Sequence, residues 1–225
     1  MDRVPPVKVV VGCLASAAEA RLAVSFGVAA IGLVEETPTG EDRLAPEEIA
    51  TIVEAVPAAV GTFLLTAARD VDRLEELARR TGVNTLQLWD GLASEDYGRL
   101  RRRLPAVSLV QSIHVQDDSA VECAVSVSRH VDAILLDSAD PEPPHRWQSV
   151  AGRPHDWEIS RRVADAVEIP VIVSGGLDPQ NVGRAIRIVR PFGVAVCSGV
   201  RGDGGLDRSL LVAFLEAVRR QSKVI

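Results

Sequence analysis

Lysine is almost absent from this chain of 225 residues. Only Lys8 and Lys223 occur, so arginine supplies nearly all of the positive charge. Enzymes that work through a Schiff base need a lysine in the active site. Lys223 lies in the C-terminal tail, and Lys8 opens the first predicted strand at the end away from the expected site. The composition therefore argues against an imine-forming enzyme.

Cysteine is also scarce, with Cys13, Cys123 and Cys197 far apart, odd in number and without C-x-x-C spacing. We expect these residues to be reduced thiols of a cytoplasmic protein, and not a disulfide framework or a zinc site. The four histidines include no pair at i, i+4 on a predicted helix. We therefore expect no bound metal.

Two kinds of segment are missing as well. The N-terminus has no charged stretch followed by an apolar core, so we expect no signal peptide. The longest apolar runs have the length of a strand, which predicts no membrane partner. The net charge is −6 and the isoelectric point is about 5.3, which argues against nucleic acid as the main partner. A local anion pocket is compatible with this net charge.

What the chain does have is a regular alternation of short apolar runs and longer amphipathic segments. It predicts an α/β protein with a buried parallel sheet, one domain spanning residues 1–225. Eight strand–helix units favour a closed (β/α)₈ TIM barrel. An open doubly wound sheet is the competing interpretation, but no G-x-G-x-x-G follows the first strand. The predicted strands are 8–11, 29–34, 59–65, 85–88, 107–112, 133–136, 171–173 and 194–197; the predicted helices are 16–26, 46–56, 71–81, 94–104, 119–129, 157–166, 181–189 and 208–220.

Serine and glycine follow the seventh and eighth predicted strands, as Ser174-Gly175-Gly176 and Ser198-Gly199. In barrel enzymes the loops after these two strands often hold a phosphate. Glycine lets backbone N–H groups approach an oxyanion closely, and the serine hydroxyls add donors. These two segments predict a binding site for the phosphate of a small metabolite.

The stretch 170–200, PVIVSGGLDPQNVGRAIRIVRPFGVAVCSGV, resembles the C-terminal third of the phosphoribosylanthranilate isomerase family. Shorter similarities at 27–32, 86–88, 135–137 and 156–157 extend the resemblance over nearly the whole chain. The family implies a barrel of tryptophan biosynthesis that uses neither metal nor cofactor. Its reaction is an Amadori rearrangement, in which an acid opens the ribose ring and a base removes the C2′ proton.

The resemblance implies that Asp137, directly after the sixth predicted strand, is the general acid. It implies a cysteine base at the end of the first strand, where the family's Cys-Gly is here Gly12-Cys13. Side chains alternate between the two faces of a strand, so this exchange could turn the thiol out of the barrel. A bulge at Gly12 would instead return Cys13 to the site. Both outcomes stay open at this point, with His114 and Glu35 as alternative bases.

Other family positions have changed. The arginine that contacts the substrate carboxylate corresponds to Asp42 or to Arg43 one place later, and a lysine on the fifth strand is replaced near Gln111. Trp89 lies at the end of the fourth predicted strand and His114 just past the fifth, where they could contact the substrate. The residue after Ser198-Gly199-Val200, usually acidic in the family, is Arg201.

The leading hypothesis is an aldose–ketose isomerase of this family acting on a small phosphorylated metabolite. A diverged paralogue with different proton-transfer or elimination chemistry on a phosphosugar is one alternative. A phosphometabolite-binding pseudoenzyme is another. The sequence leaves the formation of a homodimer open.

Overall fold

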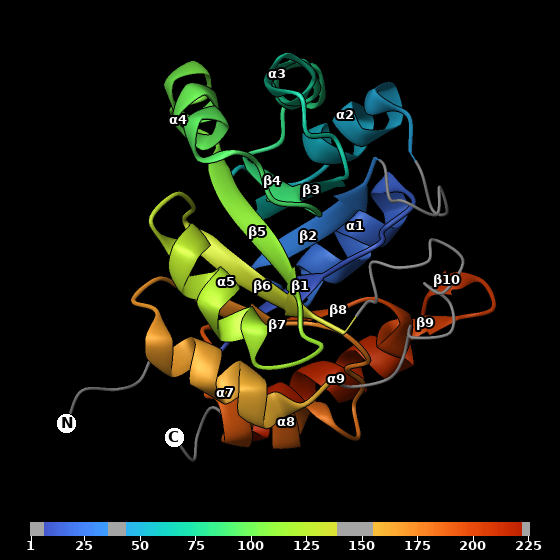
Figure 1. Cartoon of the computed structure of the whole chain (residues 1–225). Coiled ribbons are helices and arrows are strands. Elements are labelled where there is room, and N and C mark those ends of the chain that lie inside the picture. The colour runs from blue at the N-terminus through green and yellow to red at the C-terminus, as the bar shows by residue number, and fades with distance from the viewer. Residues whose placement is uncertain (1–6, 36–43, 139–154, 222–225) are drawn as a thin grey trace.

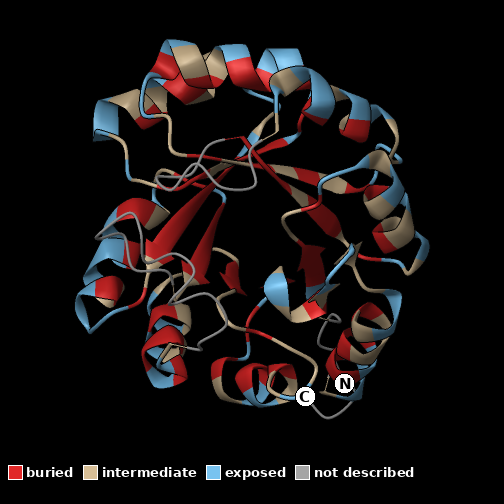
Figure 2. Cartoon of the chain, turned by 90° about the vertical axis from the view of Figure 1, so that its right-hand side faces the viewer, coloured by how far each residue is buried: buried red, intermediate tan, exposed pale blue. Residues whose placement is uncertain are grey.

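The computed structural model describes residues 7–35, 44–138 and 155–221. Eight parallel strands of this described part form a closed barrel in sequence order, with the helices in a ring around it (Figures 1 and 2). The predicted (β/α)₈ barrel is confirmed, and the open doubly wound sheet is excluded. The strands are β1 (Lys8–Val11), β2 (Ala30–Val34), β3 (Gly61–Thr66), β4 (Thr85–Leu88), β5 (Ser108–His114), β6 (Ala133–Asp137), β7 (Val171–Val173) and β8 (Gly193–Val196).

Several of the helices begin at side-chain caps. Ser16 caps α1 (Ala17–Ser25) by accepting a hydrogen bond from the Glu19 N–H, and Asp70 caps α3 (Val71–Thr81) in the same way. Gly82 ends α3 in the left-handed conformation, with φ of 69°. The other helices are α2 (Pro46–Glu54), α4 (Ser94–Arg103), α5 (Ser119–Ser128), α7 (Trp157–Ala166), α8 (Val182–Val189) and α9 (Arg208–Gln221).

Along each strand, alternate side chains point into the barrel interior, and the others face the surrounding helices. On β6, Ala133 and Leu135 belong to the interior cluster, whereas Ile134 and Leu136 belong to the larger cluster between strands and helices. Figure 2 shows this burial, with buried strands inside a ring of helices whose outer faces are exposed. The alternation decides which residues at the carboxyl ends of the strands point into the barrel mouth.

The barrel closes where β1 pairs with β8. Val9 lies beside Val194 and Val11 beside Val196 in a parallel register. This pairing brings the segment after β1 next to the segment after β8, although they are more than 180 residues apart in the sequence.

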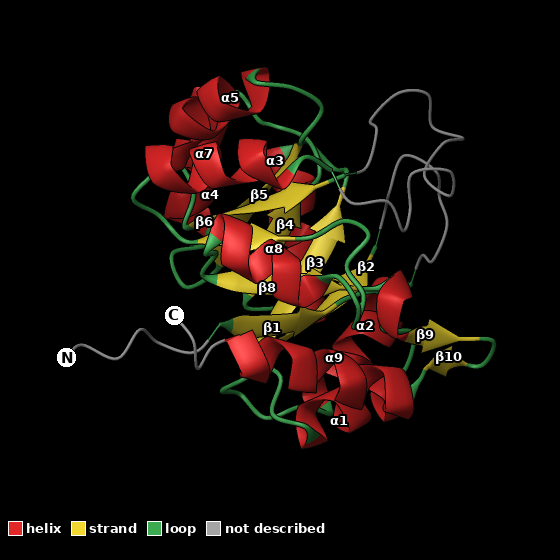
Figure 3. Ribbon diagram, turned by 90° about the horizontal axis from the view of Figure 1, so that it is seen from below, coloured by secondary structure: helices red, strands yellow, loops and turns green. Residues whose placement is uncertain are grey.

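Three short elements after β8 were not predicted. A single 3₁₀ turn, η2 (Ser198–Val200), is followed by an antiparallel pair, β9 (Arg201–Gly202) and β10 (Gly205–Leu206). Figure 3 shows this hairpin projecting from the barrel beside α9. Two-residue strands leave no hydrophobic period in the sequence, so pattern analysis does not detect them. No helix in the described ranges is both long and apolar enough to span a bilayer.

A mostly buried histidine precedes α7. The His155 Nε2 and the Ser160 Oγ are 2.6 Å apart. Burial lowers the pKa of His155 to about 4, and the nearby Asp156 carboxylate opposes this shift only in part. The imidazole is therefore neutral in the folded protein at pH values where it would be protonated in the unfolded chain.

We expect acid to destabilise the protein through His155. Between the folded pKa of about 4 and the ordinary value of 6.5, the unfolded chain binds the extra proton, so the free energy of unfolding increases with pH. This contribution is complete above pH 6.5 and is lost as the pH falls towards 4, with an upper limit of about 3 kcal/mol. Urea unfolding at about pH 4.5 and about pH 7.5 measures it. The same pH difference in wild type and in His155→Gln would contradict the prediction.

Candidate active site

The end of β6 presents a carboxylate to the barrel mouth. Asp137 is the last residue of β6 and continues the inward row of Ala133 and Leu135. Its Oδ1 accepts a hydrogen bond of 2.7 Å from the Ser138 N–H, and its own carbonyl accepts one from the Val115 N–H. The strand and this local bond fix where the carboxyl group lies, as a proton donor in a reaction needs.

Two aromatic rings lie on the same side of the mouth. His114 ends β5 directly beside Asp137 in the parallel register. The Trp89 and His114 ring centroids are 4.7 Å apart, with the planes tilted by 48°. Trp89 follows β4 and is only 4% exposed. The structure thus brings Trp89, His114 and Asp137 together on three neighbouring strands.

The chain turns sharply after β1. The Gly12 N–H still donates to the Val196 carbonyl, as a continuation of the β1–β8 pairing, whereas Cys13 has a left-handed backbone with φ of 56°. This conformation is uncommon for a residue other than glycine. The change of direction therefore occurs at Cys13 itself, and not as a bulge at Gly12.

This turn brings Cys13 to Cys197, and the two sulfur atoms are paired as a disulfide. Their Cα atoms are 5.7 Å apart. Cys197 continues the inward row of β8 after Ala195, which belongs to the interior cluster. The sulfur of Cys13 therefore lies at the β1–β8 side of the mouth. Our expectation that all three cysteines are reduced is wrong for this pair, because barrel closure joins residues that local spacing keeps apart.

The Cys13 turn is held by a charged pair from the segments beside it. The Arg201 guanidinium donates a 2.7 Å hydrogen bond to the Cys13 carbonyl and lies 3.5 Å from the Glu19 carboxylate. Glu19 also accepts hydrogen bonds from the N–H groups of Ala15 and Leu206. One ion pair thus joins the loop after β1, the start of α1 and the β9–β10 hairpin.

We expect Arg201→Gln to lower the free energy of unfolding by about 1–2 kcal/mol, because it removes a charge-assisted hydrogen bond and leaves Glu19 without its cation. Both side chains are mostly shielded, with 26% and 16% exposure. Arg69→Gln is the matched control, because Arg69 is 67% exposed in its pair with Asp90 and such pairs contribute little. Urea unfolding of both variants checks the prediction, and equal stability losses would contradict it.

Backbone amides converge where β7 and β8 end. Gly175 and Gly176 have φ of 77° and 61°, a conformation that favours glycine. No acceptor among the described residues takes the N–H groups of Gly176, Ser198 and Gly199. Successive free N–H groups of this kind form an anion-binding concavity. The two predicted phosphate segments are therefore adjacent and have donors available.

The two segments touch at glycines. A Cβ on Gly199 would lie 2.0 Å from the Leu177 carbonyl oxygen, and a Cβ on Gly175 would lie 2.2 Å from the Ser138 Oγ. Ser138, which the sequence did not single out, thus adjoins the phosphate segment directly after the candidate acid. The segment after β7 is held by Asn181, whose side-chain amide donates a 2.7 Å hydrogen bond to the Gly176 carbonyl. Asp178 in turn accepts a hydrogen bond from the Asn181 N–H.

The sequence model of the family described as N-(5′-phosphoribosyl)anthranilate isomerase matches residues 12–217. The chain belongs to this family. N-(5′-phosphoribosyl)anthranilate isomerase from Haloferax volcanii is 36% identical over 195 residues, which cover 86% of this chain and 84% of that protein. The fold is shared with phosphoribosyl anthranilate isomerase from Thermococcus kodakaraensis, at 28% identity and a TM-score of 0.77, over 95% of this chain and 99% of that one.

A further phosphoribosyl anthranilate isomerase crystal structure matches with a TM-score of 0.78 at 23% identity, over 95% of this chain and 99% of that chain. That protein was crystallised with reduced 1-(o-carboxyphenylamino)-1-deoxyribulose 5-phosphate. At this identity the match is evidence for the fold of the barrel only.

Glu35, one of the two alternative bases considered from the sequence, lies outside the barrel wall. Glu35 follows β2 and is only 4% exposed. Its carboxylate is 2.8 Å from the Arg73 guanidinium on α3 and accepts a 3.0 Å hydrogen bond from the Thr66 hydroxyl. These partners on the helix side remove Glu35 from the candidate bases.

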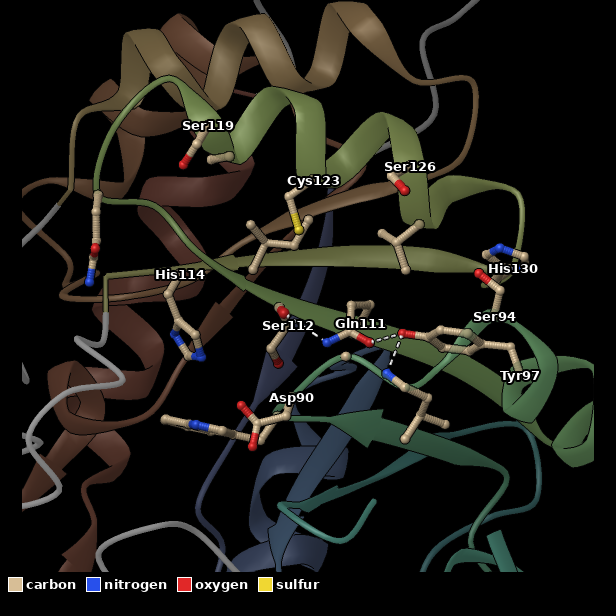
Figure 4. Close-up of a pocket in the computed structure, with 17 residues that line it drawn as sticks. Asp90, Ser94, Tyr97, Gln111, Ser112, His114, Ser119, Cys123, Ser126 and His130 are labelled. Atoms are coloured by element: carbon tan, nitrogen blue, oxygen red, sulfur yellow. Dashed lines mark hydrogen bonds between the residues drawn. The ribbon is translucent and has the colours of Figure 1, made fainter. Parts of the chain in front are cut away.

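The structure also places Gln111, near which the family's strand 5 lysine is replaced. Gln111 lies between Leu109 and Ile113, which face the helices, so it points away from the barrel interior. The Tyr97 hydroxyl donates a 2.6 Å hydrogen bond to its Oε1 (Figure 4). Ser112 takes the inward position, where its hydroxyl accepts a hydrogen bond from the Gln87 amide. Gln111 cannot contact a substrate inside the barrel.

Gln111 instead lines a pocket of about 480 Å³ between α4 and α5 (Figure 4). Trp89 and His114 form the end of the pocket that adjoins the barrel mouth. Arg43, predicted to contact the substrate carboxylate, lies outside the described residues. Within the described ranges, no three His, Cys, Asp or Glu side chains are grouped to hold a metal ion.

Proposed function

We propose that the protein is a phosphoribosylanthranilate isomerase that converts the phosphoribosylated amine to an aminoketose. Asp137 is the general acid, and Cys13, in its thiolate form, is the general base. The phosphate is held by the amides and hydroxyls of Ser174, Gly175, Gly176, Ser198 and Gly199. We propose further that Trp89 and His114 line the aglycone side and that Arg43 pairs with the carboxylate.

The observation that carries this proposal is the position of Asp137 and Cys13 around the barrel. Asp137 ends β6 and Cys13 follows β1, which are three strands apart in the closed order of eight. The reaction needs an acid at the ring oxygen and a base at C2′, on opposite sides of the sugar. His114 lies on β5 next to Asp137, on the side of the acid. Cys13 is therefore the better base, and His114 is assigned to substrate contact.

The proton balance follows from these positions. Asp137 donates a proton to the ring oxygen as the C1′–O bond breaks and the nitrogen lone pair forms the iminium ion. The Cys13 thiolate then removes the C2′ proton, and the electron pair moves to form the enolamine. Tautomerisation yields the aminoketose. No step uses a metal or a redox cofactor, and the isomeric product has the mass of the substrate.

The amides at β7 and β8 supply the anchor for this chemistry. A phosphate bound by them places the ribose between the β6 and β1–β8 sides of the mouth. Backbone donors need no lysine, which agrees with the composition of the chain. The small phosphorylated metabolite is thus the proposed partner, and we propose a single-domain, cytoplasmic protein.

The test is turnover of phosphoribosylanthranilate by the thiol-reduced protein, with the aldose and ketose separated by chromatography. We expect ketose formation that saturates with substrate concentration. A folded protein that binds ribose 5-phosphate without forming ketose would instead be a pseudoenzyme. Formation of a different product would indicate the diverged paralogue.

A further inference from the structure

We infer that Cys13 and Cys197 form a reversible dithiol switch that small disulfide oxidants close, and that its closure stops catalysis. The inference rests on the proposed function, in which Cys13 is the base. It assigns Cys197 a role that the reaction itself does not need.

Barrel closure places the two residues for disulfide formation. The β1–β8 register continues through the bond from the Gly12 N–H to the Val196 carbonyl, directly before Cys13 and Cys197. A Cβ on Gly12 would lie 3.8 Å from the Cys197 Cβ, so Cys197 faces the space above Gly12. The Cα separation of 5.7 Å is within the range of ordinary disulfides.

Catalysis and the disulfide need the same sulfur atom. A general base must accept a proton from the substrate. The Cys13 thiolate can do this, whereas a disulfide sulfur is not basic enough. The oxidised protein is therefore without its base, whatever the state of Asp137. The phosphate segment is already in place with the disulfide formed, because the structure holds both together. Oxidation should remove turnover and keep phosphate binding.

The chemistry balances with a low-molecular-weight disulfide, RSSR, as the oxidant. The Cys13 thiolate attacks one sulfur, forms a mixed disulfide and releases RS⁻. The Cys197 thiolate then attacks the Cys13 sulfur and displaces the second RS⁻. The protein loses two electrons and two protons, and RSSR becomes two RSH. A small dithiol reverses both steps. A reactive thiol beside a second, resolving cysteine is the usual arrangement of such switches.

Cys123 would complicate this experiment, because it is a third thiol that can react with the oxidant. It is an exposed free thiol on α5. Replacing it, as Cys123→Ser, gives a parent in which thiol counts and adducts report on Cys13 and Cys197 alone. The matched variant is Cys197→Ser in that parent, which keeps the base and removes the resolving thiol.

Both proteins are treated with oxidised glutathione, freed of small molecules, and then assayed by intact mass, turnover and binding of inorganic phosphate. We expect the parent to lose two hydrogens without an adduct, and to lose turnover at least about 100-fold. We expect its phosphate affinity to stay within about threefold. The Cys197→Ser variant should keep a glutathione adduct. Dithiothreitol should restore both proteins, and reduced Cys197→Ser should turn over like the reduced parent.

Three results would overturn the inference: both thiols persisting in the oxidised parent, full turnover with the disulfide formed, or loss of phosphate binding on oxidation. Failure of the proposed function is a separate result, because the reduced parent would then lack turnover while its thiol chemistry is still measured by mass.

Discussion

The substitution Asp137→Asn is expected to lower kcat by about 10²–10⁴, because it removes the proton that opens the ribose ring. Asparagine has nearly the same shape, and its side-chain oxygen can still accept the hydrogen bond from the Ser138 N–H. Folding and phosphate affinity should therefore be retained. Steady-state kinetics of the reduced protein, with urea unfolding in parallel, measure both parts of this prediction.

The matched control is Asp90→Asn at the same end of the barrel. Asp90 pairs with Arg69, which is largely exposed, so its loss should change kcat by less than about twofold. Equal effects of the two substitutions would assign the loss to the charge of the barrel rim. An Asp137→Asn variant with wild-type kcat would remove Asp137 from the mechanism.

The substitution Gly199→Ala is expected to raise KM by about tenfold or more, and to lower the free energy of unfolding by about 1–3 kcal/mol. The new Cβ would lie 2.0 Å from the Leu177 carbonyl oxygen and 2.9 Å from the Asp178 Cα. Both neighbours are backbone atoms, so the β7 and β8 segments must move apart. Their amides then no longer converge on one phosphate.

Gly204→Ala is the control for adding a methyl group after β8. A Cβ on Gly204 would meet no heavy atom within 4 Å. It should leave KM unchanged and stability within about 0.5 kcal/mol. The phosphate assignment fails if Gly199→Ala folds with reduced stability but binds inorganic phosphate and substrate as the wild type does.

The fold could be predicted because its signals are local. Alternating apolar runs, the Ser16 cap and Gly82 each act within a few residues, so pattern analysis finds them without the rest of the chain. The position of Asp137 follows from the same periodicity, since it directly extends an apolar strand. The β9–β10 hairpin was missed because two-residue strands carry no period.

The direction of the Cys13 side chain and the surroundings of Cys13 could not be predicted for a different reason. Strand alternation alone turns Cys13 outward, and the left-handed backbone that redirects it depends on contacts made by distant segments. Glu35 was a candidate base until its pairing with Arg73 placed it outside the barrel. In both cases a side chain's direction depends on partners that sequence spacing does not reveal.

By itself, the sequence determined a barrel of eight strand–helix units, the glycine and serine segments after its last two strands, and the position of Asp137 after the sixth. Only the tertiary structure decided that Cys13 meets Cys197, that Arg201 holds the turn at Cys13, and that Asp137 and Cys13 lie on different sides of the mouth. The physical reason is that the barrel closes by pairing its first strand with its last. Periodicity acts over a few residues, whereas the β1–β8 seam joins residues 184 positions apart.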